Sequence, residues 1–306
     1  MQVKTKALLA IFIAAVLWAS AGTVAKILVA RTDPFIVAFY RFGIASVILL
    51  PFFLKEKKPK GFFRALLPLG LFNSLNVLFY YTGAARTTAN TIIILGTAVP
   101  IVTTVLSYIL IHETVSKQKA LGISLGLVGA LFIVLLPILV QGQALGGTLT
   151  GNLLEVGSLL SWSSYIVYSR FILSKGKYSP VLSTSMNFFA CAVSSALAAL
   201  ITRQSFYVPP FATPSYLGTM LFAAIILTVV TYFLFQWGVQ HVSASTASLK
   251  EYVQLVIGIG INAAILGEHF TLAYFIGSLF IVVGVLIATG QHVSRKLAGL
   301  LFAQEN

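Results

Sequence analysis

Charged residues are the scarcest class in this 306-residue chain, at 9% of the sequence, and only seven of them are acidic. Soluble domains carry about 25% charged residues, so a soluble globular fold is excluded. The 58% hydrophobic content indicates a polytopic membrane protein. The net charge of +13 does not indicate nucleic-acid binding, because the basic residues gather at the ends of apolar runs rather than along a basic, aromatic-lined stripe.

Cysteine, aspartate and the usual catalytic motifs are also nearly absent. Cys191 stands alone in an apolar run, so there is no disulfide framework that would report a redox compartment. The one aspartate, Asp33, falls at a loop, which excludes an intramembrane aspartate dyad. His112 and Glu113 resemble the start of a zinc-protease motif, but Ser116 stands where the second histidine is needed. With no phosphate-binding loop either, we expect neither an enzyme nor a primary pump, and no metal or other cofactor.

Long apolar runs are what the sequence has in abundance. About 20 apolar residues cross a hydrocarbon core of about 30 Å, and lipid tolerates no unpaired backbone groups, so each run should be a helix. The first run is longer than the roughly 7–15 apolar residues of a signal peptide and is interpreted as an uncleaved span. We therefore predict an all-α membrane protein with ten transmembrane helices, at 7–29, 34–54, 64–85, 89–112, 119–139, 152–172, 180–201, 214–238, 244–266 and 271–290.

The basic residues predict how these spans are oriented. Fourteen of them fall at one set of alternate helix ends and only three, Arg31, Arg86 and Arg203, at the other. Because basic loops stay on the cytoplasmic side, we predict that both termini are cytoplasmic, in the plasma membrane of a bacterium or archaeon. The fourteen are Lys4, Lys6, Lys55, Lys57, Lys58, Lys60, Arg64, Lys117, Lys119, Arg170, Lys175, Lys177, Arg295 and Lys296.

An internal repeat divides the chain at the glycine-rich, uncharged loop 141–151. The segment LFYYTGAARTTANT (78–91) aligns with FLFQWGVQHVSAST (233–246) at an offset of 155. Because each copy holds an odd number of helices, the second enters the membrane from the opposite side. We therefore predict two inverted five-helix repeats, 1–145 and 146–306. Offset 155 also pairs Gly122 with Gly277, Gly129 with Gly284 and Glu113 with Glu268, and offset 144 pairs Trp18 with Trp162 and Lys26 with Arg170.

Several motifs stand in a specific order along nearly the whole chain. They are LWAS (17–20), DPFIVAFYRFGIAS (33–46), AVPIVTTVLSYILIHETVSKQKALGISLGLVGALFIV (98–134) and ILGEHFTLAYFIGSLFIVVGVLI (265–287). Together they resemble the drug/metabolite transporter superfamily, specifically its ten-helix EamA-type branch. The resemblance implies secondary transport, a central cavity walled mainly by helices 1, 3, 4, 6, 8 and 9, and peripheral fifth and tenth helices. The family's helix-4 proline is present as Pro100, but its counterpart in helix 9 is Leu255, so the substrate cannot be carried over from a relative.

Two adjacent charges, Lys250 and Glu251, lie about seven residues into the ninth predicted helix, roughly 10 Å deep at 1.5 Å per residue. A charge at a span centre costs about 2.5–3.5 kcal/mol and normally turns inward, although Lys250 could also snorkel to the interface. Neighbours on a helix point about 100° apart, so we expect the two to have separate partners, one of which could be the ligand. Gln254, Gly258 and Asn262 continue the same polar or small face.

Other predicted helices offer faces for the same cavity. Trp18 and Trp162, each about eleven residues into its helix, are expected near the symmetry axis at mid-membrane, with ordinary packing as the alternative. For Asn76, a plain inter-helix hydrogen bond worth about 0.6–2 kcal/mol is an equal alternative. Helix 6 has a polar face of Glu155, Ser158, Trp162, Tyr165 and Ser169. The predicted substrate-binding set is Trp18, Asn76, Tyr80, Trp162, Tyr165, Tyr232, Lys250, Glu251 and Gln254.

Two further cations are assigned structural or coupling roles. Arg41, about seven residues into the second predicted helix, is expected to tie that helix to backbone carbonyls or a carboxylate. Lys26 lies near the outer end of the first helix, where it could equally snorkel. Glu113 is interpreted as a helix-end residue.

The combined prediction is a secondary transporter that works by alternating access around a central cavity. The favoured substrate is a small polar metabolite, an amino acid or related zwitterion. Lys250 would meet its carboxylate, and Glu251 its amine or a coupling proton. The residues expected to enclose its non-polar part are Trp18, Tyr80, Trp162 and Tyr165.

Other functions stay open. Phosphorylated or nucleotide-linked metabolites, carried by exchange, would need Arg41 to join Lys250, and a non-transporting membrane scaffold would show no saturable uptake. A channel is disfavoured because no ring of charges or carbonyl filter is visible. The expected partners are the substrate and the lipid bilayer, with no nucleic acid, and a coupling proton is left open. Transport direction and the choice between monomer and homodimer are open.

Overall fold

The computed structural model describes residues 2–141, 147–207, 211, 213–266 and 272–289. Glu268 and the C-terminal basic residues Arg295 and Lys296 lie outside the described residues, as do 271 and 290, the predicted ends of the tenth span. In the described residues the helices are α1 (Val3–Trp18), α2 (Ala21–Val29), α3 (Pro34–Lys55), α4 (Phe62–Ala84), α5 (Ala89–Gly96), α6 (Val99–Ile111), α7 (Lys117–Gln141), α8 (Leu149–Leu173), α9 (Pro180–Ile201), α10 (Pro214–Ala224), the π-helical segment η2 (Ile225–Val230), α11 (Thr231–His241), α12 (Ala244–Ser248), α13 (Lys250–Leu266) and α14 (Leu272–Thr289).

Helices occupy all ten predicted spans, and the protein is an all-helical integral membrane protein. Within the described residues, five helical stretches are long and apolar enough by themselves to cross a bilayer. These are Val3–Val29, Pro34–Lys55, Phe62–Ala84, Pro180–Ile201 and Pro214–His241. The count of ten spans and the side on which the termini lie stay predictions.

Several predicted spans are not continuous α-helices. The first, fourth and ninth are each interrupted, between α1 and α2, α5 and α6, and α12 and α13, and the eighth contains the π-helical segment η2. In the fourth span the cause is Pro100, the second residue of α6. Its ring removes a backbone N–H and clashes with the carbonyl four residues earlier, at Gly96, where α5 ends. In η2 the backbone carbonyl of Leu227 accepts hydrogen bonds from side chains of other helices.

The start of the second helix in each predicted repeat uses the same local device. The Asp33 side chain accepts a hydrogen bond from the backbone N–H of Phe35 and caps α3. Ser179 caps α9 by accepting from a backbone N–H in the same way. Each cap is followed by a proline at the first helical position, where its missing N–H costs nothing.

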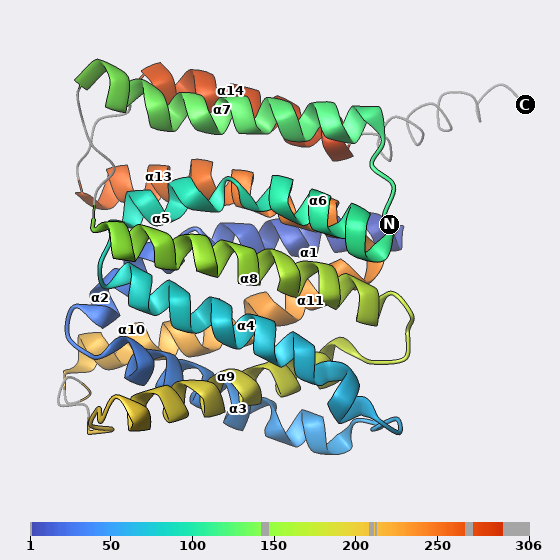
Figure 1. Ribbon diagram of the computed structural model, residues 1–306, viewed down its shortest axis with the longest axis vertical. Coiled ribbons are helices and arrows are strands. Elements are labelled where there is room, and N and C mark those ends of the chain that lie inside the picture. The colour runs from blue at the N-terminus through green and yellow to red at the C-terminus, as the bar shows by residue number, and fades with distance from the viewer. Residues whose placement is uncertain (1, 142–146, 208–210, 212, 267–271, 290–306) are drawn as a thin grey trace, which may run out of the picture.

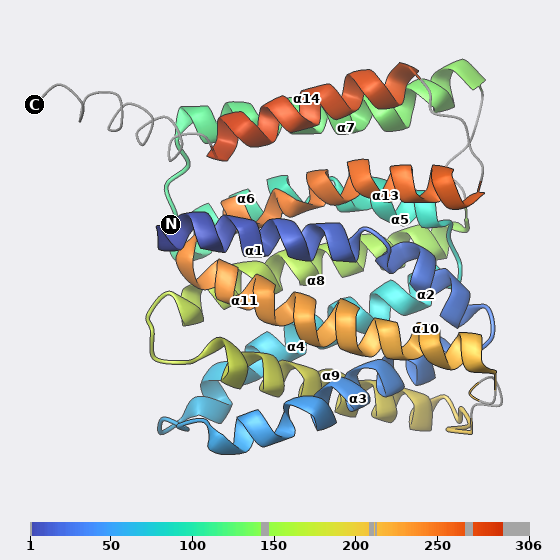
Figure 2. The same cartoon turned by 180° about the vertical axis from the view of Figure 1, so that it is seen from behind.

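The helices stack in layers that run roughly parallel to one another (Figures 1 and 2). α7 packs on α14 at one edge, α3 packs on α9 near the other, and α1 on α11 and α4 on α8 lie between. The α7–α14 contact is close because glycines face it, with Gly122 against Gly284 and Gly129 against Gly277. Gly122 pairs with Gly277 in the sequence repeat, and Gly129 with Gly284. Exchanging the two halves of the repeat therefore turns the Gly122–Gly284 contact into the Gly129–Gly277 contact.

The internal repeat is also visible in two basic side chains, one in each half, that cap backbone carbonyls at opposite ends of the bundle. The Lys26 amine donates to the carbonyls of Ala84 (2.8 Å) and Thr87 (2.7 Å), at the C-terminal end of the third predicted span. Arg170, its counterpart in the second half, donates to the carbonyl of Gln240 at 2.8 Å, at the end of the eighth. α1 runs away from the N-terminal end of the bundle, whereas α8 runs toward it (Figure 1). Lys26 therefore has a capping role.

A candidate binding cavity between the two halves

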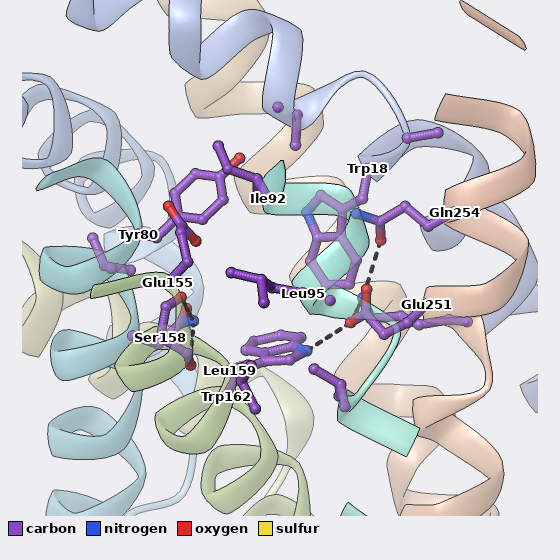
Figure 3. Close-up of a pocket in the computed structure, with 18 of the residues that line it drawn as sticks. Trp18, Tyr80, Ile92, Leu95, Glu155, Ser158, Leu159, Trp162, Glu251 and Gln254 are labelled. Atoms are coloured by element: carbon purple, nitrogen blue, oxygen red, sulfur yellow. Dashed lines mark hydrogen bonds and ion pairs between the residues drawn. The ribbon is translucent and has the colours of Figure 1, made fainter. Parts of the chain in front are cut away.

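A cavity of about 140 Å³ lies between helices of the two halves (Figure 3). Its walls come from α1–α6, α8, α11 and α13, and within the described residues α7 and α14 contribute none, which matches their expected peripheral place. The second predicted span, α3 in the structure, was not named in the expected wall, but it contributes Arg41. Among the residues described, no three His, Cys, Asp or Glu side chains are placed to hold a metal ion. Eight of the nine predicted site residues line the cavity: Trp18, Asn76, Tyr80, Trp162, Tyr232, Lys250, Glu251 and Gln254.

The prediction that Lys250 and Glu251 have separate partners is wrong. The Lys250 amine forms an ion pair with Glu251 Oε1 at 2.6 Å and also donates to Gln254 Oε1 at 3.2 Å. Lys250 begins α13 directly after the break at Leu249, and its long, flexible side chain folds back toward its neighbour. The 100° rule for adjacent residues describes Cβ directions and does not limit where a lysine amine can reach.

Aromatic rings surround this ion pair. The Lys250 amine lies 4.5 Å from the ring centroid of Trp18, 5.1 Å from that of Trp162 and 5.7 Å from that of Phe235. Ring faces attract a cation more strongly where water is excluded, and Lys250 is only 4% exposed. Trp162 also donates its indole N–H to Glu251 Oε1 at 2.9 Å. The charges are thus held by the cavity wall itself.

The two tryptophans related by the repeat meet, as predicted. Trp18 and Trp162 are in edge-to-face contact, with ring centroids 5.7 Å apart and an interplanar angle of 87°. Tyr165 does not line the cavity as predicted, because it stacks on Trp162 with centroids 5.0 Å apart and lies behind it. Tyr165 therefore supports the wall instead of meeting a ligand.

The π-helical segment η2 provides the anchor for Arg41. A π-helical turn leaves carbonyls without their usual partner four residues on, and the carbonyl of Leu227 accepts from both Trp18 (2.9 Å) and Arg41 (2.7 Å). Arg41 also donates to the hydroxyls of Thr228 at 2.6 Å and Tyr81 at 2.8 Å. The predicted tie to a backbone carbonyl is confirmed, and hydroxyls take the place of the alternative carboxylate.

The opposite wall of the cavity carries a second acidic group, Glu155 (Figure 3). Its side chain comes from α8, is 3% exposed, and has an oxygen, Oε1, without a hydrogen-bond partner. Beside it, Asn76 donates to the backbone carbonyl of Ser158 at 3.1 Å and to its hydroxyl at 2.9 Å. Glu155 belongs to the polar face predicted for the sixth span, which is α8 in the structure, but it was not included in the predicted substrate-binding set. Its acidic character within a span was the signal that could have selected it.

Polar bonds between the halves close the bundle on the side of the N-terminus. Glu113 forms an ion pair with Arg170 at 3.1 Å, and its other oxygen accepts the backbone N–H of Ala244 at 2.9 Å. Lys119 donates to the hydroxyl of Ser243 at 2.8 Å. Glu113 therefore lies just beyond the C-terminal end of α6, as predicted, and joins the end of α8 to the start of α12.

Comparison with known proteins identifies the family. The sequence profile of the EamA-like transporter family matches the chain twice, over residues 5–135 and 149–290. The chain belongs to the EamA-like transporter family. This protein is therefore a membrane transporter of the drug/metabolite transporter superfamily, as the motifs suggested.

Relatives of this EamA-like transporter are distant but cover most of its length. A WAT1-related protein of Arabidopsis thaliana is 25% identical, covering 94% of this chain and 91% of its own length. The uncharacterized transporter YetK of Bacillus subtilis is 27% identical, over 88% and 82% of the two chains. A solved crystal structure superposes with a TM-score of 0.71 at 19% identity, covering 96% of this chain and 99% of that one. That likeness supports the fold.

Proposed function

We propose that this EamA-like transporter is a secondary transporter of a small zwitterionic metabolite of the amino-acid class. The observation that carries the proposal is the charge balance of the cavity wall. Two cations, Arg41 and Lys250, and two acids, Glu155 and Glu251, line it. With all four groups ionised their charges sum to zero, so a ligand with equal positive and negative charge leaves the buried site balanced, as buried charges require.

The size of the cavity supports a small substrate. Its volume of about 140 Å³ is close to the roughly 150 Å³ of an engineered protein cavity that holds one benzene molecule. A small aliphatic amino acid fits this space, and a nucleotide-linked sugar does not. A phosphorylated substrate is less favoured, because Arg41 uses three of its five N–H donors on neutral acceptors that hold it in the wall.

In this proposal the substrate carboxylate binds beside Lys250. A lysine ammonium has three donors, and Lys250 uses two of them, on Glu251 and Gln254. The third is available to an anionic oxygen that approaches the amine from the cavity. The apolar part of the substrate would contact the leucines that lie between the two polar walls, Leu95 and Leu159 (Figure 3).

Alternating access of two inverted halves, across ten spans, would carry the substrate over the bilayer. The Glu113–Arg170 pair and the Lys119–Ser243 bond hold the halves together on the side of the N-terminus. We infer that this side is cytoplasmic and that its bonds must break before the cavity can open there. Such cycling, in a bacterial or archaeal plasma membrane, needs only the substrate and its gradient or a coupling proton.

The decisive experiment is a counterflow screen in proteoliposomes. The purified protein is reconstituted, and uptake of labelled neutral amino acids, phosphorylated sugars, nucleosides and organic cations is measured with and without a pH gradient. We expect saturable counterflow of a neutral amino acid. Counterflow of phosphorylated sugars alone would favour the alternative substrate class. The absence of saturable flux for every compound would favour a non-transporting role.

A further inference from the structure

One acidic group in the cavity has an unused acceptor. Glu155 lies seven residues into α8 and is 3% exposed, yet its Oε1 has no hydrogen-bond partner. Of the ion pairs in the part of the chain that the structure describes, one joins Arg170 to Glu113 and the other joins Lys250 to Glu251. Neither includes Glu155. A buried carboxyl in this condition is unfavourable unless a donor or a cation reaches it.

The place of this carboxyl is set by a glycine on the facing helix. A Cβ built on Gly83 of α4 would stand 2.5 Å from Glu155 Oε1 and 3.0 Å from its Cδ. No side chain larger than hydrogen fits there while the carboxyl stays in place. The absence of a side chain at Gly83 thus forms the seat of the Glu155 carboxyl, and the cavity lies on its other side.

The neighbouring cation and the second acid are both already engaged. Lys26 is close to this region, but its amine donates to the carbonyls of Ala84 and Thr87, at 2.8 and 2.7 Å. Glu251, on the far wall, accepts from Lys250 and from the indole of Trp162 through one oxygen. Glu155 is therefore the acid whose Oε1 still lacks a donor.

We propose that Glu155 binds the ammonium group of the substrate, and that Gly83 positions it to do so. This inference rests on the proposed function and moves the amine-binding role from Glu251, where the sequence suggested it, to the opposite wall. An ammonium that enters beside Tyr80 would meet the carboxyl from the cavity side, at the oxygen that does not rest against Gly83. The substrate carboxylate would lie toward Lys250, which is next to Glu251 on the opposite wall (Figure 3). With an acid on one wall and a cation on the other, the cavity would select compounds that carry both an ammonium and a carboxylate. A primary ammonium suits the acidic wall because its three N–H groups donate in different directions.

The test uses propylammonium chloride as an amine without a carboxylate and sodium propionate as a carboxylate without an amine. Binding to the full chain in nanodiscs is followed by tryptophan fluorescence, because Trp18 and Trp162 lie in the cavity wall. We expect saturable quenching by propylammonium in the unmodified protein and at least about tenfold weaker binding in Glu155→Gln, the loss of a charge-assisted hydrogen bond. Propionate binding should be unchanged by that substitution.

Gly83→Ala provides a second variant that keeps the charge and displaces only the carboxyl. It should weaken propylammonium binding as well, whereas Gly218→Ala, whose new methyl group meets nothing within 4 Å, should not. Equal propylammonium affinity in the unmodified protein and Glu155→Gln overturns the inference, and so does no propylammonium binding to the unmodified protein. Gly83→Ala keeps the test valid if Glu155→Gln does not fold.

Alanine counterflow separates this inference from the proposed function. If the unmodified protein and Glu155→Gln exchange alanine equally well, transport of a zwitterion stands and the role of Glu155 falls. If propylammonium binds through Glu155 but no amino acid shows counterflow, the ammonium subsite stands and the proposed function falls.

Discussion

Removing the Lys250 amine should destabilise the protein more than removing both members of its ion pair. In Lys250→Met, the Glu251 carboxylate keeps the indole N–H of Trp162 but loses the cation at 2.6 Å. The side chains of Lys250 and Glu251 are only 3% and 10% exposed, so water cannot replace the lost partner. In the double variant Lys250→Met, Glu251→Gln, no charge of the pair is left behind, and glutamine can still accept from the indole.

The magnitude follows from the burial of the pair. Breaking a buried ion pair by removing one partner costs about 3–5 kcal/mol, whereas replacing both with uncharged groups of similar shape is often close to neutral. The single variant also loses the attraction of Lys250 to the surrounding rings, about 1–2 kcal/mol, but the double variant loses this too. Because the ring term cancels, we expect the single variant to be less stable than the double variant by about 3–5 kcal/mol.

The assay is unfolding by dodecyl sulfate in mixed micelles, followed by far-ultraviolet circular dichroism. The double variant should unfold at a higher dodecyl sulfate fraction than the single variant, and below the unmodified protein by no more than the loss of the cation–ring attraction, about 1–2 kcal/mol. A single variant as stable as the unmodified protein, or a double variant less stable than the single one, would refute the argument from a buried pair. In proteoliposomes both variants should lose counterflow of the amino acid, because both lack the cation for its carboxylate.

Three further outcomes are expected from other parts of the structure. Arg41→Lys should lower the free energy of unfolding in the same assay by at least about 2 kcal/mol, since an ammonium cannot replace a planar group that spans a carbonyl and two hydroxyls; unchanged stability would contradict the anchoring role. Gly122→Ala places a methyl group against the α14 backbone and should lower the free energy of unfolding by about 1–3 kcal/mol. The control Gly43→Ala, which has open space around it, should not, and equal effects of the two variants would count against the close α7–α14 contact. Glu113→Gln removes the ion pair with Arg170 and should increase maleimide labelling of a cysteine placed at Ser245, compared with the same cysteine in a protein that keeps Glu113. Unchanged labelling would show that this ion pair does not keep the N-terminal side of the bundle closed.

The sequence by itself determined the class of the protein and most of the polar and aromatic residues in the cavity wall. Lipid tolerates neither unpaired backbone groups nor exposed charges, so apolar run length predicts helices, and polar residues within a run must face inward. That reasoning selected Trp18, Lys250 and Glu251 correctly as neighbours of one cavity. The repeat also carried three-dimensional information, because Trp18 and Trp162 match in sequence and meet in space.

Only the tertiary structure decided which of these groups are engaged and which are available. The ion pair of Lys250 with Glu251 depends on the rotamer of a flexible side chain, and the place of Tyr165 behind Trp162 depends on the packing of aromatic rings. The unpaired oxygen of Glu155 depends on Gly83, 72 positions earlier in the chain (155 − 83), on a different helix. A sequence pattern reports the face of one helix, whereas the availability of a charge is settled by atoms that the other helices bring within a few ångströms of it.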